Sequence, residues 1–174
     1  ITLGRLQLSG RGQKCIPITD ACGDRVFISP GKQSVLLNAS AYQESENTRL
    51  NLCFCPDAEF QAEVERMDEQ IVEQLRPRLS ELSMDPTTDW YRSPLKQYTG
   101  GTWCMRTKIN VSGKTSLRCW DLARKRCPYP EDWTTVTVTP RIWVKQLYVM
   151  PKECGLILEC QDVLIEPKVP TCPL

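Results

Sequence analysis

The chain of 174 residues contains no histidine. Histidine is the usual general base of Ser–His–Asp and Cys–His catalysis and the side chain whose charge changes between pH 5 and 8. Its absence excludes those catalytic arrangements, imidazole-based zinc sites and a histidine pH switch. A zinc site at Cys53-Phe54-Cys55 is the weaker alternative, because the usual two-residue spacing is missing. The nucleophile elbow, the phosphate-binding glycine-rich loop and the dinucleotide fingerprint are also missing. We therefore predict a protein that is not an enzyme and holds neither a metal nor a cofactor.

Long apolar runs are also absent. No stretch approaches the eighteen or so residues that a membrane-spanning helix needs, and no leader peptide with a charged and then an apolar segment is recognisable. We find no internal repeat and no low-complexity tract. We therefore expect no membrane span in this portion of the chain.

Cysteine, in contrast, is abundant, with ten residues in the chain. A high and even cysteine count is typical of proteins in oxidising compartments, so we predict five disulfides. Short loops favour bridges between Cys15 and Cys22 and between Cys119 and Cys127, but spacing leaves the connectivity open. The cysteines predicted to form disulfides are Cys15, Cys22, Cys53, Cys55, Cys104, Cys119, Cys127, Cys154, Cys160 and Cys172.

Two glycosylation triplets agree with this interpretation. Asn38 and Asn110 each begin an Asn-x-Ser motif, which marks a surface position in a secreted glycoprotein. Together with the cysteines, they predict a secreted protein or the extracellular part of a cell-surface protein.

One segment has a sustained helical period. Its apolar residues recur at steps of three and four and so share one helical face, which requires a core to pack against. These residues are Phe60, Val64, Met67, Ile71, Leu75, Leu79 and Leu82. We predict a helix from Ala58 to Leu75 with Asp57 as its N-cap, followed by a short turn that Pro77 opens. The opposite face is acidic.

The rest of the chain predicts strands and turns. Arg49 to Phe54 alternates in polarity, Trp103 to Val111 with Thr115 to Trp120 indicates a β-hairpin, and Ile142 to Met150 indicates a central strand. The predicted fold class is α+β and β-rich, a disulfide-pinned antiparallel sheet or sandwich covered by one amphipathic helix. We expect a single extracellular domain, or two tightly joined halves. Its parts are strands in 1–56, the helix in 57–82, a long loop in 83–101 and an antiparallel sheet in 102–174.

Charge is distributed unevenly along the chain. Nine acidic and three basic residues lie between Asp57 and Asp85, and nine basic residues and one acidic residue lie between Arg92 and Arg126. The basic segment could bind a polyanion such as a sulfated glycan, or it could be a solvated face that balances the acidic helix. The candidate anion-binding residues are Arg106, Lys108, Lys114, Arg118, Arg124, Lys125 and Arg126.

A second candidate surface is aromatic. Trp, Tyr and Arg contribute most of the binding energy in protein interfaces, although such residues can also form a satellite core under a loop. The candidate partner-binding residues are Trp90, Tyr91, Arg92, Tyr98, Tyr129 and Trp133.

These observations predict a non-enzymatic extracellular recognition protein that binds a protein partner. It could be a receptor ectodomain, a secreted ligand or decoy that binds a receptor, or a pathogen surface glycoprotein. The alternative is a matrix component that binds a polyanion or glycosaminoglycan through the basic hairpin. Nucleic acid is not expected as a partner outside the cell.

Overall fold

A computed structural model describes residues 1–41 and 48–169. Within these residues the chain forms thirteen strands, one α-helix and two short 3-10 helices. The strands are β1 (Thr2–Leu3), β2 (Gln7–Leu8), β3 (Lys14–Thr19), β4 (Val26–Ile28), β5 (Gln33–Ala41), β6 (Arg49–Cys55), β7 (Tyr91–Arg92), β8 (Leu95–Gln97), β9 (Trp103–Asn110), β10 (Arg118–Trp120), β11 (Arg126–Cys127), β12 (Val136–Val149) and β13 (Cys154–Pro167). The helices are α1 (Ala58–Leu75), η1 (Arg76–Arg78) and η2 (Trp133–Thr135). The predicted β-rich α+β class is confirmed.

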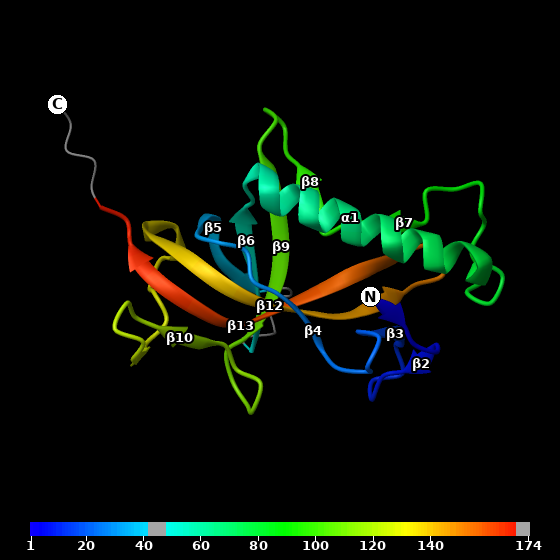
Figure 1. Cartoon of the computed structure of the whole chain (residues 1–174), viewed down its shortest axis with the longest axis horizontal. Helices are drawn as coiled ribbons and strands as arrows, with labels where there is room; N and C mark the ends of the chain where they lie inside the picture. Colours follow the sequence, from blue (N-terminus) through cyan, green and yellow to red (C-terminus); the bar gives the residue numbers. More distant parts are fainter. Residues whose placement is uncertain (42–47, 170–174) are drawn as a thin grey trace.

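Five of the strands close into a barrel (Figure 1). β12 and β13 form a long antiparallel pair that runs from Val136 opposite Pro167 to Val149 opposite Cys154. β5 pairs with the start of β12 and with β6, β6 pairs with β9, and β9 pairs with β13 where Lys108 lies opposite Glu159. The ring β12-β5-β6-β9-β13 is therefore closed, so neither edge of these strands is left unpaired along the ring.

β12 and β13 are fourteen residues long each and extend beyond this ring. Along the edge that faces away from β13, β12 pairs in turn with β5, β4 and β3. Along the opposite edge β13 pairs in turn with β7, β9 and β10, all three in parallel. The two long strands therefore connect nearly every part of the sheet.

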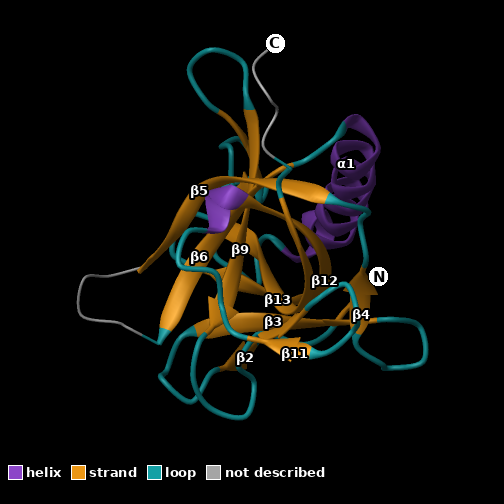
Figure 2. Ribbon diagram, turned by 90° about the vertical axis from the view of Figure 1, so that its left-hand side faces the viewer, coloured by secondary structure: helices purple, strands orange, loops and turns teal. Residues whose placement is uncertain are grey.

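The helix confirms its prediction at both ends. Asp57 caps α1, since its carboxylate accepts a hydrogen bond of 2.8 Å from the Phe60 backbone N–H. Pro77 lies in η1, which directly follows the helix. Every residue of the predicted apolar stripe, from Phe60 to Leu82, is buried. Figures 1 and 2 show α1 along one side of the sheet, which its apolar stripe covers.

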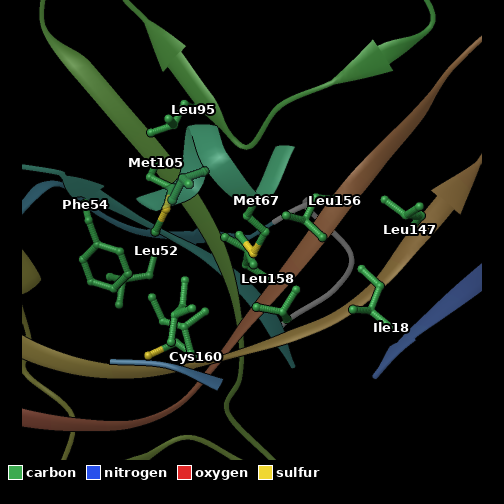
Figure 3. Packing of buried hydrophobic residues seen from close by; sticks show 14 of the residues in the cluster. Ile18, Leu52, Phe54, Met67, Leu95, Met105, Leu147, Leu156, Leu158 and Cys160 are labelled. Atoms are coloured by element: carbon green, nitrogen blue, oxygen red, sulfur yellow. The ribbon is translucent and has the colours of Figure 1, made fainter. Parts of the chain in front are cut away.

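The buried side chains form one contiguous core. Leu52 and Phe54 of β6 and Met105 of β9 are fully buried inside the barrel, because alternate residues of a strand face the same side. Figure 3 shows Met67 of α1 beside Leu156 of β13, where the helix meets the sheet. The core is therefore shared between the barrel interior and the layer under α1.

The sheet is mixed, and the prediction of an antiparallel C-terminal sheet is wrong. The hairpin predicted between Trp103–Val111 and Thr115–Trp120 does not form: β10 pairs with β11 and, in parallel, with β13. β9 and β10 instead follow one another along the same edge of β13. The predicted long loop in 83–101 contains β7 and β8.

The predicted disulfide pinning is also wrong for the cysteines that the structure describes, since all nine are free. Cys172 lies outside the described residues. Cys119 and Cys127 lie opposite each other on β10 and β11 but are not bonded. Burial raises the pKa of Cys119 to about 12 and that of Cys154 to about 11, so both are neutral thiols at pH 7. The backbone ladder that closes the barrel connects the strands, and the buried thiols act as small apolar side chains.

Among the described residues, no helix combines the length and the hydropathy that crossing a membrane requires.

The helical face can be tested with one substitution on each side of α1. Ile71 is fully buried, so Ile71→Asp places a charge in the core and should lower the free energy of unfolding by about 4 kcal/mol or more. Glu69 is exposed, so Glu69→Lys should change it by less than about 1 kcal/mol. Urea denaturation followed by circular dichroism measures both values. Equal losses would show that the buried face of α1 is misassigned.

Candidate functional site

The outward face of β12 carries a cation, an aromatic ring and a second cation in succession. Arg141, Trp143 and Lys145 occupy alternate positions of the strand, so they project to the same side. Between them, Ile142 and Val144 are fully buried on the opposite side. The strand therefore separates a core face from a polar, aromatic face.

β4 adds a second ring to this surface. Phe27 lies opposite Trp143 in the β4–β12 ladder. The Arg141 guanidinium lies 3.7 Å from the centre of the Phe27 ring, and the Arg25 guanidinium lies 4.4 Å from the centre of the Trp143 ring. The Lys145 ammonium lies 5.1 Å from the same Trp143 ring. Each ring is thus in cation–π contact with at least one basic side chain.

A third ring comes from the other edge of β13. In the parallel pairing of β10 with β13, Trp120 lies opposite Leu164, and the Arg126 guanidinium lies 5.3 Å from the centre of its ring. Figure 1 shows β10 on the far side of the sheet from α1. We call this surface the aromatic–basic face. It comprises Arg25, Phe27, Arg118, Trp120, Arg126, Arg141, Trp143 and Lys145.

Two carboxylates of β13 lie between these basic residues. Glu159 is 1% exposed, and its oxygens accept a hydrogen bond of 2.7 Å from the Lys145 ammonium and one of 3.3 Å from the Asn110 amide. Asp162 accepts one of 2.7 Å from the Arg118 guanidinium. Both acids therefore have direct cationic partners, which reduces their negative field at the surface.

Asp162 also has two further contacts. The Trp120 indole N–H donates to it at 3.0 Å, and the Arg141 guanidinium lies 3.7 Å away. Burial disfavours its ionised form, but the hydrogen bonds from Arg118 and Trp120 and the charges of Arg118 and Arg141 outweigh burial. The net effect is a pKa below the ordinary aspartate value. Asp162 is therefore a fixed, ionised acceptor at neutral pH.

The basic surface continues onto the neighbouring strands of the barrel. Arg106 and Lys108 are on the outward face of β9, where they lie opposite Cys53 and Asn51 of β6. The Cys104 thiol donates a hydrogen bond to Cys53, and this bond together with the nearby Arg106 charge lowers the pKa of Cys53 to about 6. Cys53 itself is 8% exposed, so the surface here is formed by the basic side chains.

The structure brings together most of the predicted anion-binding residues. Arg118 and Arg126 belong to the aromatic–basic face, and Arg106 and Lys108 lie on β9 beyond β13. Arg124 lines a pocket within the same face. Lys114 and Lys125 are exposed on the turns that precede and follow β10.

Most side chains of the predicted aromatic partner site are buried or hydrogen-bonded within the fold. Trp90 and Trp133 are 5% and 4% exposed and belong to the core, as the satellite-core alternative expects. The Tyr91 hydroxyl donates to Asp68, and the Tyr129 hydroxyl donates to the Leu117 carbonyl. Arg92 forms ion pairs with Asp89 and Glu153, and Tyr98 is 41% exposed.

The two predicted glycosylation asparagines make structural hydrogen bonds. The Asn38 side chain accepts from the Trp133 backbone N–H and donates to the Glu131 carbonyl. The Asn110 amide donates to Thr115 and to Glu159. The Asn38 side chain therefore connects β5 to the segment that precedes β12. The Asn110 side chain connects the end of β9 to the following turn and to β13.

Five residues of the aromatic–basic face were not identified from the sequence: Arg25, Phe27, Arg141, Trp143 and Lys145. The alternation of Arg141, Trp143 and Lys145 is visible in the sequence, but it overlaps the segment from Ile142 to Met150, which predicts a central strand that is apolar on both faces. Arg25 and Phe27 carry no local signal, because they join the site only through the pairing of β4 with β12.

The chain resembles known proteins in its fold but not in its sequence. No protein-family model matches the chain, and no curated protein is similar to it in sequence. Among solved structures, it is similar to the single-stranded DNA-binding protein of bacteriophage Enc34 in complex with ssDNA. That match has a TM-score of 0.54 and 8% identity and covers 82% of this chain and 87% of that one.

Two further solved structures are similar. The single-stranded DNA-binding protein gp2.5 of bacteriophage T7 matches with a TM-score of 0.50 and 13% identity, over 86% of this chain and 91% of that one. The Enc34 protein in a separate structure matches with a TM-score of 0.51 and 9% identity, over 100% of this chain and 97% of that one.

These similarities correct the predicted function and location. An extracellular recognition protein, secreted or on the cell surface and without a nucleic-acid partner, is contradicted by a fold shared with single-stranded DNA-binding proteins of bacteriophages. The described cysteines form no disulfide either, which removes the main support for an oxidising compartment. The predictions of a protein partner, of a sulfated glycan and of a secreted glycoprotein are therefore withdrawn.

The buried ion pair under the aromatic–basic face can be tested by removing its cation. Lys145→Met leaves the buried Glu159 carboxylate without its 2.7 Å partner and should lower the free energy of unfolding by about 2–3 kcal/mol. Adding Glu159→Gln to Lys145→Met removes the buried charge and should restore part of this loss. Urea denaturation of the two variants and the unmodified protein provides the comparison. A single variant as stable as the unmodified protein would contradict the proposed electrostatics.

Proposed function

We propose that the chain binds single-stranded DNA through the aromatic–basic face. The observation that carries the proposal is the contact of three half-buried rings, Phe27, Trp120 and Trp143, with basic side chains on one continuous surface. Sites for single-stranded nucleic acid combine a positively charged surface along the backbone with aromatic rings on which bases stack. The function is binding only, with no reaction.

The architecture supports this proposal. A closed five-stranded barrel resembles the OB-fold, a Greek-key barrel whose outer face binds oligonucleotides and oligosaccharides. The solved structures with a similar fold described above are single-stranded DNA-binding proteins, one of them in complex with ssDNA. At 8% and 13% identity this likeness concerns the fold, so the assignment of binding depends on the side chains of this chain.

The charges of the face suit a phosphate backbone. Arg25, Arg126 and Arg141 can each exchange a ring contact for a phosphate contact while remaining on the same surface. The two acids of the face, Glu159 and Asp162, are paired with cations and so repel phosphates only weakly. These charges should therefore attract the phosphates of any strand, whatever its sequence.

The rings favour a single strand over a duplex. An unpaired base exposes its flat face for stacking, whereas the bases of a duplex are already stacked on one another. Phe27 and Trp143 are neighbours across β4 and β12, and Trp120 lies two strands away across β13. A strand that crosses β4, β12, β13 and β10 would therefore meet rings at both ends of its path.

Arg106 and Lys108 of β9 extend the cationic surface along the edge of β13. Their position next to the face implies that a long strand continues over the barrel after leaving Trp143. The affinity should accordingly increase with strand length until this surface is filled.

Stacking on the face can be tested with a fluorescently labelled thymine strand. Trp143→Ala should weaken binding about tenfold, because it removes one stacking platform. Tyr98→Ala removes an exposed aromatic ring outside the face and should leave the affinity unchanged. Fluorescence anisotropy titrations measure both affinities, and circular dichroism checks that each variant is folded. An equal loss in both variants, or no binding by the unmodified protein at low salt, would refute the proposal.

Phosphate contact can be tested by the salt dependence of binding. Each cation that neutralises a phosphate of a single strand contributes about −0.7 to the slope of log affinity against log salt. Arg25→Ala and Arg141→Ala should each make the slope shallower by about that amount. Arg66→Ala removes an exposed cation from α1 and serves as the matched control. An identical slope in all four proteins would exclude Arg25 and Arg141 as phosphate ligands.

A further inference from the structure

A pocket of about 430 Å³ opens within the aromatic–basic face, between the β10–β11 hairpin, the end of β4 and the facing segments of β12 and β13. Its size lies in the range of pockets that hold small ligands. Its lining residues are Ser29, Trp120, Arg124, Thr139, Pro140, Arg141, Asp162 and Leu164.

The lining combines three kinds of chemistry. Trp120, Pro140 and Leu164 provide flat and apolar walls, Arg124 and Arg141 provide cations, and Asp162 provides an anionic acceptor. A nucleotide has the matching parts: a flat base, a phosphate and polar groups along the base edge. The pocket is therefore better suited to one nucleotide than to a purely apolar or purely anionic ligand.

Asp162 is the unexpected member of this lining, because a carboxylate repels the phosphates of a bound strand. Its side chain is 16% exposed, and two donors hold it in place, the Arg118 guanidinium and the Trp120 indole. The Arg141 guanidinium lies 3.7 Å away as a third, electrostatic partner. An ionised carboxylate only accepts hydrogen bonds and has about four lone-pair sites, so capacity for another donor remains. The exocyclic amino group of a base is such a donor, and thymine has none.

Arg124 has an unusual backbone conformation. Its φ of +59° is unfavourable for any residue with a Cβ and is usually occupied by glycine or asparagine. The turn imposes it: the Arg124 N–H donates to the Asp121 carbonyl at 2.9 Å, and the Lys125 N–H donates to the Asp121 carboxylate at 2.9 Å. The turn therefore fixes the Arg124 backbone beside the pocket that its side chain lines.

We propose that this pocket receives one unpaired base that carries an exocyclic amino group, as cytosine does, from a bound single strand. The base packs against Trp120, its amino group donates to Asp162, and an adjacent phosphate contacts Arg124. This proposal rests on the function proposed above and adds a base preference to it. An Asp or Glu acceptor paired with the cytosine amino group is a known form of base recognition.

The base preference is tested with two strands of equal length, one of thymine only and one of alternating thymine and cytosine. The unmodified protein should bind the alternating strand about tenfold more tightly. Asp162→Asn offers the base both an acceptor and a donor, and it should abolish the preference. The ratio of the two affinities is measured within one protein preparation, so a general loss of stability cannot produce this result.

The role of Arg124 is tested with Arg124→Gly, which should retain or raise the melting temperature, because glycine adopts the left-handed conformation without strain. The same variant should bind both strands about fivefold more weakly, since one phosphate contact is lost. Ser83→Gly is the matched control: Ser83 has a φ of +55° and is exposed outside the face, so its replacement should leave the affinity unchanged.

The outcomes separate this proposal from the one on which it rests. If the unmodified protein binds neither strand, the proposed function itself is refuted. If it binds both strands equally and Asp162→Asn changes nothing, DNA binding stands and the base pocket is refuted. If Arg124→Gly binds as tightly as the unmodified protein, the phosphate contact at Arg124 is refuted.

Discussion

The structure depends on the backbone pairing of β12 with β13. This ladder is antiparallel over nearly all of both strands and interrupted only by irregularities near Arg141 and Val144. In the described residues, six other strands pair directly with β12 or β13: β3, β4, β5, β7, β9 and β10. β6 completes the ring between β5 and β9. The ladder closes the barrel, and its extension past the ring supplies the surface under α1 and the outward face of β12. Without this pairing, neither the core nor the aromatic–basic face would exist as a continuous unit.

The same ladder places opposite charges where they compensate one another. Glu159 and Asp162 of β13 face Trp143 and Arg141 of β12, so each acid lies within reach of a base on a neighbouring strand. Burying Glu159 would be costly if it were alone, but Lys145 and Asn110 supply its missing solvation. The result is a surface with more basic than acidic side chains, in which both carboxylates are paired with cations.

Charge is also separated between the elements of the fold. The exposed residues of α1 are mostly acidic, whereas the exposed residues of β9, β10 and the outward side of β12 are mostly basic. Under the proposed function, a DNA strand is attracted to the strands and repelled by the helix. The helix thus contributes to the core through one face and presents an acidic surface through the other.

Ten cysteines in a short chain led to the wrong cellular environment, for a physical reason. A buried free thiol and a disulfide are the same residue in a sequence, and they differ only in whether a second sulfur lies within bonding distance. Cys119, Cys154 and Cys160 are at most 1% exposed and pack in the core as small apolar side chains. The fold needs no covalent links between strands, because the closed ladder already joins them.

The sequence alone determined the helix, its N-cap at Asp57, its buried stripe and the β-rich class, because a period of 3.6 or 2 residues is set by local backbone geometry. It also indicated the basic residues Arg118, Arg124 and Arg126, but with the wrong partner. Only the tertiary structure decided that β10 pairs with β13 rather than with β9, since strand pairing depends on contacts between residues far apart in the chain. The site followed the same rule: Arg25 and Trp143 are distant in sequence and meet only because β4 pairs with β12.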